Sequence, residues 1–175
     1  MADFRIAFEW AMRFEDPGMA CSQVPDAVPA GCTGPCFAIS GINSGAWPSQ
    51  FASIAALPQN SRLNAVQAFY QANYWNDWFT QLVSDELAKR VFDFGVNAGS
   101  GTAVKTLQQA VNALGGSLTV DGGWGPHTLA AVNAADQPAL VQGFIAARVA
   151  HYRAIAAANP ADARYLGGWL SRAQA

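Results

Sequence analysis

The sequence has little charge and no surplus of either sign. Only 13% of its 175 residues are charged, and ten basic against twelve acidic residues give a formal net charge of −2. No basic excess is available to neutralise the phosphates of a nucleic acid or to draw the chain to an anionic membrane. We therefore expect no nucleic-acid partner. Because 51% of the residues are apolar, an intrinsically disordered chain is excluded as well.

Long hydrophobic runs are also absent. No uninterrupted apolar stretch reaches the roughly 18 residues that a membrane-spanning helix needs. Asp3 stands where a signal peptide has basic residues, and Glu9 and Arg13 interrupt any apolar region behind it. We expect no stable membrane insertion, synthesis in the cytoplasm and help from another protein on any route to the periplasm or cell wall. The length fits a single domain, 1–175, and a monomer.

Metal-binding patterns and several common catalytic motifs are missing too. Cys21, Cys32 and Cys36 lie close together, but His127 and His151 are far along the chain and in no ligand-like spacing. We expect no metal. One disulfide and three ordinary thiols stay open as alternatives for the cysteines. The motifs of serine hydrolases, phosphate-binding loops and zinc proteases do not occur.

One helix near the N-terminus carries a candidate catalytic group. Phe4, Phe8 and Met12 share a face with Glu15 in the helix that their spacing predicts over residues 3–15. Partial burial of a carboxyl group against apolar side chains favours its protonated form, which a general acid for glycoside hydrolysis needs. Glu15 is placed for that role. An exposed glutamate at a helix end is the alternative interpretation.

The remainder of the chain divides into an irregular segment and a helical one. Residues 19–48 are rich in proline and glycine, which predicts a loop and a small hairpin. From residue 49 on the pattern is helical, with Ser84 and Asp136 as N-caps. We expect helices over about 49–57, 61–74, 76–82, 84–97, 101–114, 126–134, 137–158 and 160–172.

Short motifs in an ordered succession resemble a known family, the phage and bacterial muramidases of glycoside hydrolase family 108, whose second half is described as a predicted peptidoglycan-binding region. The resemblance runs nearly end to end. It rests on the first helix with Glu15, Gly41-Ile42-Asn43, Ala46-Trp47-Pro48, Tyr74-Trp75, Phe92-Asp93-Phe94-Gly95-Val96-Asn97-Ala98-Gly99, Val120-Asp121-Gly122 and Gly167-Gly168-Trp169-Leu170-Ser171-Arg172.

The resemblance implies a mainly α, lysozyme-like fold in which a small β-hairpin segment packs beside a helical bundle. Residues 1–48 then form the catalytic helix with the β segment, and residues 49–175 form the helical lobe with the peptidoglycan-binding-like sequence. It also implies hydrolysis of the β-1,4 bond between N-acetylmuramic acid and N-acetylglucosamine, with Glu15 as general acid and no cofactor. Bacterial peptidoglycan is the expected partner.

The sequence departs from the family where the second catalytic group is expected. The family's Glu-Gly-Gly-Tyr is Glu15-Asp16-Pro17-Gly18 here, and Ala38 replaces a threonine. A second group activates water or stabilises the oxocarbenium-like transition state. Asp26 and Ser40 are the candidates for it, Ser40 as a group that orients a water. Asp16 is a third candidate, with capping of the turn as its alternative role.

Five further residues are candidates for substrate binding. Asn43 and Trp47 lie in the glycine-rich segment, and an aromatic ring such as that of Tyr74 suits the apolar face of a sugar. Asp93 and Asn97 are one helical turn apart on the same face. For this last pair we also hold a structural interpretation, in which they bond neighbouring backbone near a helix end.

Two other functions compete with a muramidase, whose setting we expect to be a phage endolysin or a secretion-associated enzyme. One is a non-catalytic peptidoglycan-binding or secretion-assisting protein, which the altered residues after Glu15 favour. The other is a lytic transglycosylase, which also uses a single glutamate but closes an anhydro ring without water. Analysis of the products separates them, because hydrolysis adds one water for each bond cleaved.

Overall fold

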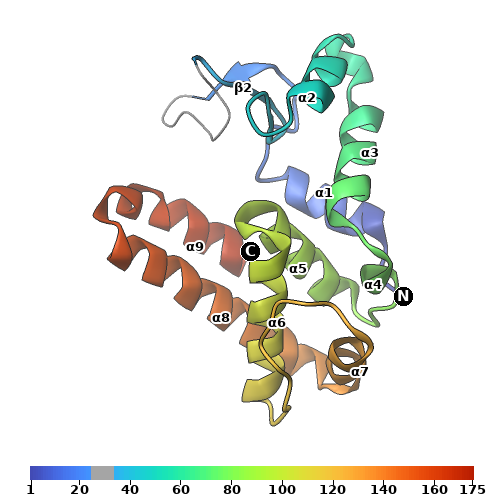
Figure 1. Ribbon diagram of the computed structural model, residues 1–175, viewed down its shortest axis with the longest axis vertical. Coiled ribbons are helices and arrows are strands. Elements are labelled where there is room, and N and C mark those ends of the chain that lie inside the picture. The colour runs from blue at the N-terminus through green and yellow to red at the C-terminus, as the bar shows by residue number, and fades with distance from the viewer. Residues whose placement is uncertain (25–33) are drawn as a thin grey trace. The chain divides into compact units, whose positions relative to one another are not determined.

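The computed structural model describes residues 1–24 and 34–175, and it is mainly helical with one small antiparallel sheet (Figure 1). This confirms the predicted fold class. By its internal packing the chain forms two compact units, residues 1–7 with 76–175 and residues 8–75. The helices are α1 (Phe4–Met12), α2 (Pro48–Ala55), η1 (Gln59–Ser61), α3 (Leu63–Tyr74), α4 (Asp77–Thr80), α5 (Asp85–Ala98), α6 (Ser100–Ala113), α7 (Pro126–Ala134), α8 (Gln137–Ala158), η2 (Pro160–Tyr165) and α9 (Leu166–Gln174).

The unit of residues 8–75 contains the sheet. Its strands β1 (Ser22–Gln23), β2 (Phe37–Ile39) and β3 (Ile42–Asn43) pair antiparallel in the order β1-β2-β3. Between β2 and β3, only Ser40 and Gly41 form the turn, with φ angles of 46° and 81°. Two successive positive φ values are the requirement of the tight hairpin turn that suits the twist of the strands. The hairpin expected in the glycine-rich segment is therefore present.

Helix α1 is shorter than the sequence pattern predicts. It ends at Met12 rather than at residue 15. The amides of Arg13 and Phe14 bond back only three residues, to carbonyls 3.2 and 3.0 Å away, which tightens the last turn. The carboxylate of Asp16 then accepts hydrogen bonds from the amides of Gly18 and Ala20, at 2.9 and 2.6 Å. Glu15 therefore lies just after the helix, and the side chain of the next residue, Asp16, caps the turn that follows.

The core of this unit joins α1, the sheet and α3. Ile39, Ile42 and Val66 are fully buried, and the rings of Phe8 and Tyr70 lie 5.9 Å apart. Burying each such side chain contributes about 1.5–3 kcal/mol to folding. The sheet and α3 are thereby held together around the segment that carries Glu15.

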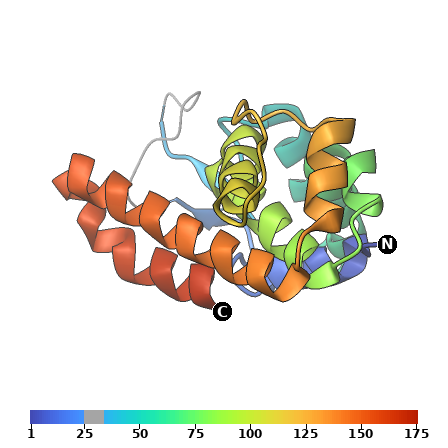
Figure 2. The ribbon, with the colours of Figure 1, turned by 90° about the horizontal axis from the view of Figure 1, so that it is seen from below.

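The other unit is a helical bundle. Helices α8 and α9 run side by side, and α5 packs against α6 (Figures 1 and 2). Ser84 and Asp136 cap α5 and α8 as predicted, because their side chains accept the amides of Leu87 and Ala139. The helix expected over 160–172 is two elements, η2 and α9. The buried core side chains of the bundle include Leu87, Phe94, Leu107, Leu140 and Phe144.

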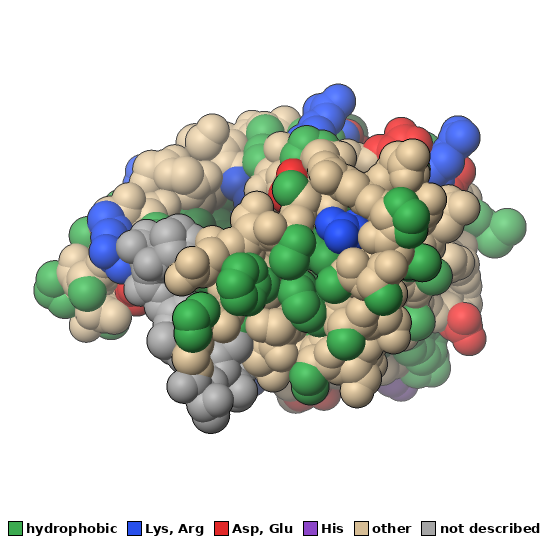
Figure 3. All heavy atoms as spheres, turned by 90° about the horizontal axis from the view of Figure 1, so that it is seen from above, with side chains coloured by type: hydrophobic (Ala, Val, Ile, Leu, Met, Phe, Trp, Pro, Cys, Tyr) green, Lys and Arg blue, Asp and Glu red, His purple; other side chains and the backbone are tan. Residues whose placement is uncertain are grey.

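Charged side chains are scattered on the surface seen in Figure 3, as the low charge content leads one to expect. Among the described residues, no helix combines the length and the apolar character needed to cross a bilayer. For the cysteines, the structure agrees with the alternative of one disulfide. Cys36 is disulfide-bonded, and Cys21 is an exposed free thiol. Cys32 lies outside the described residues.

Candidate active site

Glu15 lies against the turn of the β2–β3 hairpin. A Cβ atom built on Gly41 would come within 2.8 Å of Glu15 Oε2 and within 2.7 Å of the Tyr70 hydroxyl oxygen. Both groups therefore approach the backbone of residue 41 more closely than any side chain there allows. Glycine is required at this position twice over, by its φ of 81° and by this close approach.

Two tyrosines of α3, one helical turn apart, accompany Glu15. The buried Tyr70 donates its hydroxyl proton to the carbonyl oxygen of Ser40 at 2.7 Å, which fixes the hairpin turn to α3. The rings of Tyr70 and Tyr74 lie 5.7 Å apart. The pKa of Tyr74 is raised, first by burial of its hydroxyl and then by the negative charge of Glu15. This electrostatic effect indicates that Tyr74 lies near the Glu15 carboxylate.

Ser40 holds the backbone beside Glu15 in place. Its buried hydroxyl donates to the carbonyl oxygen of Asp16 at 2.6 Å and lies 3.0 Å from the sulfur of Met19. The structure thus brings Ser40 and Glu15 together at one turn. Asp26, another candidate for a second catalytic group, lies outside the described residues.

Asn43 and Trp47 lie at the other end of the same hairpin. The side-chain oxygen of Asn43 accepts the amides of Gly45 and Ala46, at 3.1 and 2.7 Å. The half-buried ring of Trp47 packs edge-on against Phe69 with 4.9 Å between centroids. Asn43 therefore shapes the loop that leads into α2, and Trp47 ties that loop to α3.

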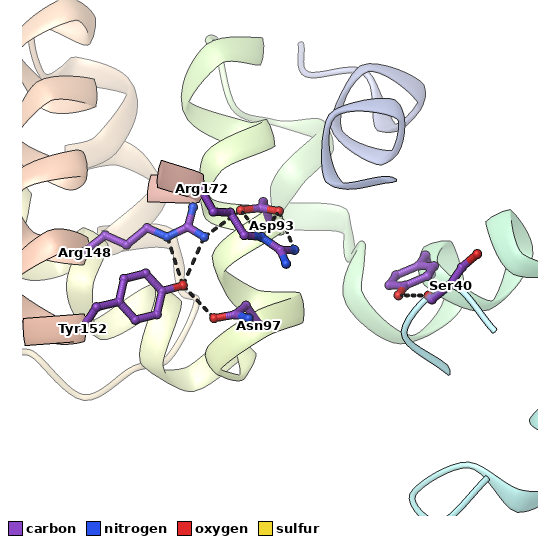
Figure 4. A network of polar contacts seen from close by, with 7 residues as sticks. Ser40, Asp93, Asn97, Arg148, Tyr152 and Arg172 are labelled. Carbon is purple, nitrogen blue, oxygen red and sulfur yellow. Dashed lines mark hydrogen bonds and ion pairs between the residues drawn. The ribbon is translucent and has the colours of Figure 1, made fainter. Parts of the chain in front are cut away.

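Asp93 lies in the bundle unit, fully buried within an ion-pair network (Figure 4). Arg172 from α9 donates to both carboxylate oxygens, with its closest contact at 2.8 Å, and Arg148 from α8 lies 2.7 Å from the carboxylate. One carboxylate of α5 thus joins three helices. This geometry agrees with a structural role, although the partners are arginines and not the backbone groups we had considered.

Asn97 belongs to the same network. Arg148 donates to the hydroxyl oxygen of Tyr152, at 3.2 Å from Nη2, and Tyr152 donates its own proton to Asn97 Oδ1 at 2.6 Å (Figure 4). Unlike Asp93, Asn97 is exposed.

In the part of the chain that the structure describes, no group of three or more His, Cys, Asp or Glu residues is placed to hold a metal ion.

Sequence reasoning missed Tyr70 and the arginine partners of Asp93. The spacing of four residues between Tyr70 and Tyr74 was a signal that could have placed both on one face of a helix. For the arginines no such signal existed, because Arg172 is 79 residues away from Asp93 along the chain.

Two sequence models of known families match most of the chain. Residues 38–99 match the sequence model "Glycosyl hydrolase 108", and residues 102–174 match "Predicted Peptidoglycan domain". Among solved structures, SagA of Brucella abortus is similar, with a TM-score of 0.70 and 24% sequence identity over 98% of this chain and 89% of SagA. No curated protein sequence matches significantly.

The fold is therefore lysozyme-like, and the protein is a glycoside hydrolase. The two family matches, which follow one another along most of the chain, identify it as a peptidoglycan hydrolase of glycoside hydrolase family 108.

Proposed function

We propose that the protein is a muramidase that hydrolyses the β-1,4 bond between N-acetylmuramic acid and N-acetylglucosamine, with Glu15 as its general acid. One observation carries the proposal: the half-buried Glu15 carboxyl group lies against Gly41 and next to the tyrosines of α3. A carboxyl group held in a fixed place, with part of its surface open, can reach a glycosidic oxygen.

The neighbours of Glu15 suit a proton donor. In the reaction, Glu15 protonates the leaving oxygen while the bond from that oxygen to the anomeric carbon breaks, and water supplies the new hydroxyl group. Glu15 is then a carboxylate. The Tyr74 phenol, whose pKa is raised by burial and then by the charge of Glu15, carries a proton that can stabilise this charge. Tyr70 and Ser40 are positioning residues, because their hydrogen bonds hold in place the turn that faces Glu15.

The second group and the sugar-binding residues are also proposals. Asp26 stays a candidate to activate water. The Ser40 hydroxyl, which is occupied by the Asp16 carbonyl, is better suited to positioning than to orienting a water. Asn43 and Trp47 form one end of the proposed substrate site, and their contacts fix a loop that carries exposed residues such as Ala46.

The test is the clearing of purified peptidoglycan by the wild type and by Glu15→Gln, with the soluble fragments analysed by mass spectrometry. Loss of a general acid lowers the rate by roughly 10²–10⁴-fold. We expect such a loss, and we expect wild-type products that end in a reducing muramic acid and carry one added water per cleavage.

Glu9→Gln is the matched control, because Glu9 is an exposed glutamate of α1 and lies only six positions before Glu15. It should clear peptidoglycan at the wild-type rate. Anhydromuramic acid products would instead identify a lytic transglycosylase, and full activity of a folded Glu15→Gln variant would remove Glu15 from the mechanism.

For the biological setting we propose a phage endolysin, on the strength of the family resemblance. Expression in a bacterial host with and without a pore-forming holin tests this role. We expect lysis only when both proteins are present. Absence of lysis in their joint presence would contradict the endolysin role without affecting the enzymatic assignment.

A further inference from the structure

One pocket outside the residues discussed for catalysis is lined entirely by residues of the bundle unit. It has a volume of about 490 Å³ and is formed where the end of α5 and the start of α6 meet α8, η2 and α9. Its lining combines aromatic rings with polar groups, among them Asn97, Thr102, Tyr152, Asp162, Tyr165 and Trp169. A concave site with apolar walls and a few polar groups is the usual form of a small-ligand site.

Three aromatic rings form one continuous wall. Tyr152 and Trp169 are stacked, with centroids 5.3 Å apart and an interplanar angle of 19°, and Tyr165 lies 5.8 Å from Trp169 at 36°. Trp169 and Tyr165 are only half-buried. Aromatic rings that keep part of their surface open contribute large contact areas with little loss of side-chain entropy. The C–H face of a pyranose ring can pack against the open parts of Trp169 and Tyr165.

The polar side of the pocket is fixed before any ligand arrives. Arg148 donates to the Tyr152 hydroxyl oxygen, so the proton of that hydroxyl is directed to Asn97 Oδ1. The oxygen of the Asn97 amide therefore faces Tyr152, and its NH₂ group is the part left for a ligand (Figure 4). An amide donor of this kind fits an acetamide carbonyl or a sugar hydroxyl.

The charge of the pocket favours a neutral ligand. Asp162 is the one carboxylate among the described lining residues, and it accepts a hydrogen bond from the side-chain amide of Asn159 at 2.9 Å. Arg164, with its guanidinium 4.6 Å from the centre of the Tyr165 ring, offsets that charge from outside the pocket. Burial lowers the pKa of His151, another lining residue, so its ring is neutral at pH 7.

We propose that this pocket binds an N-acetylglucosamine unit of the glycan strand, as an accessory subsite of the bundle unit. The aromatic wall receives the sugar face, and Asn97 binds the acetamido group. The inference rests on the proposed function, in that the glycan strand is taken as the substrate. It adds a binding site formed by the bundle unit alone, in which Thr102 and Trp169 belong to the peptidoglycan-domain match and Asn97 to the glycoside hydrolase match.

The test uses the full chain carrying Glu15→Gln, so that no ligand is cleaved. Tetra-N-acetylchitotetraose, which has no lactyl group and no peptide, is titrated in while the indole N–H signal of Trp169 and the side-chain amide signal of Asn97 are followed by NMR. We expect both signals to shift until saturation. Tyr165→Ala should weaken the binding that these signals report by about tenfold, as expected for the loss of one aromatic contact.

His127→Ala is the control, because it removes an exposed ring of the same unit that lies outside the pocket. It should bind as tightly as its parent. Unshifted pocket signals at saturating sugar, or a shift produced by the free stem peptide and not by the sugar, would overturn the inference. If Glu15→Gln abolishes clearing while these signals stay still, only the subsite fails. If Glu15→Gln still clears peptidoglycan, the assignment of the acid fails, whatever the pocket binds.

Discussion

The two compact units each hold an acidic side chain in a fixed place, but by opposite means. In residues 8–75, Glu15 is half-buried, and a glycine backbone and two tyrosine side chains lie beside it. In the bundle, Asp93 is fully buried, and its carboxylate is shared by Arg148 and Arg172.

This difference supports the proposed roles, catalytic for Glu15 and structural for Asp93. The Asp93 carboxylate is paired with two guanidinium groups, and it has no exposed surface through which to reach a substrate. The Glu15 carboxyl group keeps part of its surface open to solvent, as the proposed reaction requires. Position in the sequence pattern does not reveal this distinction, because it depends on which groups surround each acid.

Replacing each of the two acids by its amide should reveal the difference between them, and the largest effect that we expect is on stability. Asp93→Asn should lower the free energy of unfolding by about 3–5 kcal/mol, because it leaves two buried arginines without their counter-charge. Glu15→Gln should change it by only about 0.5 kcal/mol or less. Urea denaturation of both variants measures the two values. Equal losses in the two variants would show that the environments do not differ as the structure indicates.

A pair of glycine substitutions sharpens the account of Glu15. Gly41 and Gly99 both have positive φ, 81° and 88°, but a Cβ on Gly99 meets nothing within 4 Å, whereas one on Gly41 meets Glu15 and Tyr70. Gly99→Ala should cost about 1–3 kcal/mol in backbone strain, because its ψ of 143° places it in a region that essentially only glycine occupies, and it should leave activity intact. Gly41→Ala should cost more and also lower kcat, by up to about a hundredfold, since a displacement near 1 Å has effects of that size.

Denaturation curves and peptidoglycan clearing rates of the two alanine variants provide the comparison. An unchanged clearing rate in Gly41→Ala would mean that the close approach of Glu15 to the hairpin has no part in catalysis. A similar loss of rate in Gly99→Ala would assign the effect to backbone strain in general.

The sequence predicted what depends on neighbours along the chain. The helices of the bundle and the caps Ser84 and Asp136 follow from periodicity and local hydrogen bonding, and they were confirmed. The end of α1 was predicted three residues too far along, because the apolar spacing continues to Glu15 while the backbone already turns at Arg13.

What could not be predicted depends on contacts between distant residues. The pairing of Asp93 with Arg172 joins two helices 79 residues apart, and a single sequence carries no periodic signal for it. The approach of Glu15 to Gly41 depends in the same way on how α1 and the hairpin pack. The resemblance to a family pointed to Glu15 as the acid, but only the structure revealed that Tyr70 lies beside Gly41.

The smallest expected effect concerns His151, a titratable group of the bundle. Its pKa is lowered from 6.5 because burial penalises the charged ring, so the unfolded chain binds the proton more tightly than the folded one. Stability should therefore be constant well above pH 6.5 and should decrease as the pH falls through that value. His151→Phe keeps a ring against Phe94, which lies 5.3 Å from the imidazole, but cannot titrate. Urea denaturation at about pH 7.5 and about pH 5 should show a slightly larger loss in the wild type than in this variant. An identical loss in both would mean that burial of His151 makes no contribution, and that the carboxylates alone set the response of the bundle to acid.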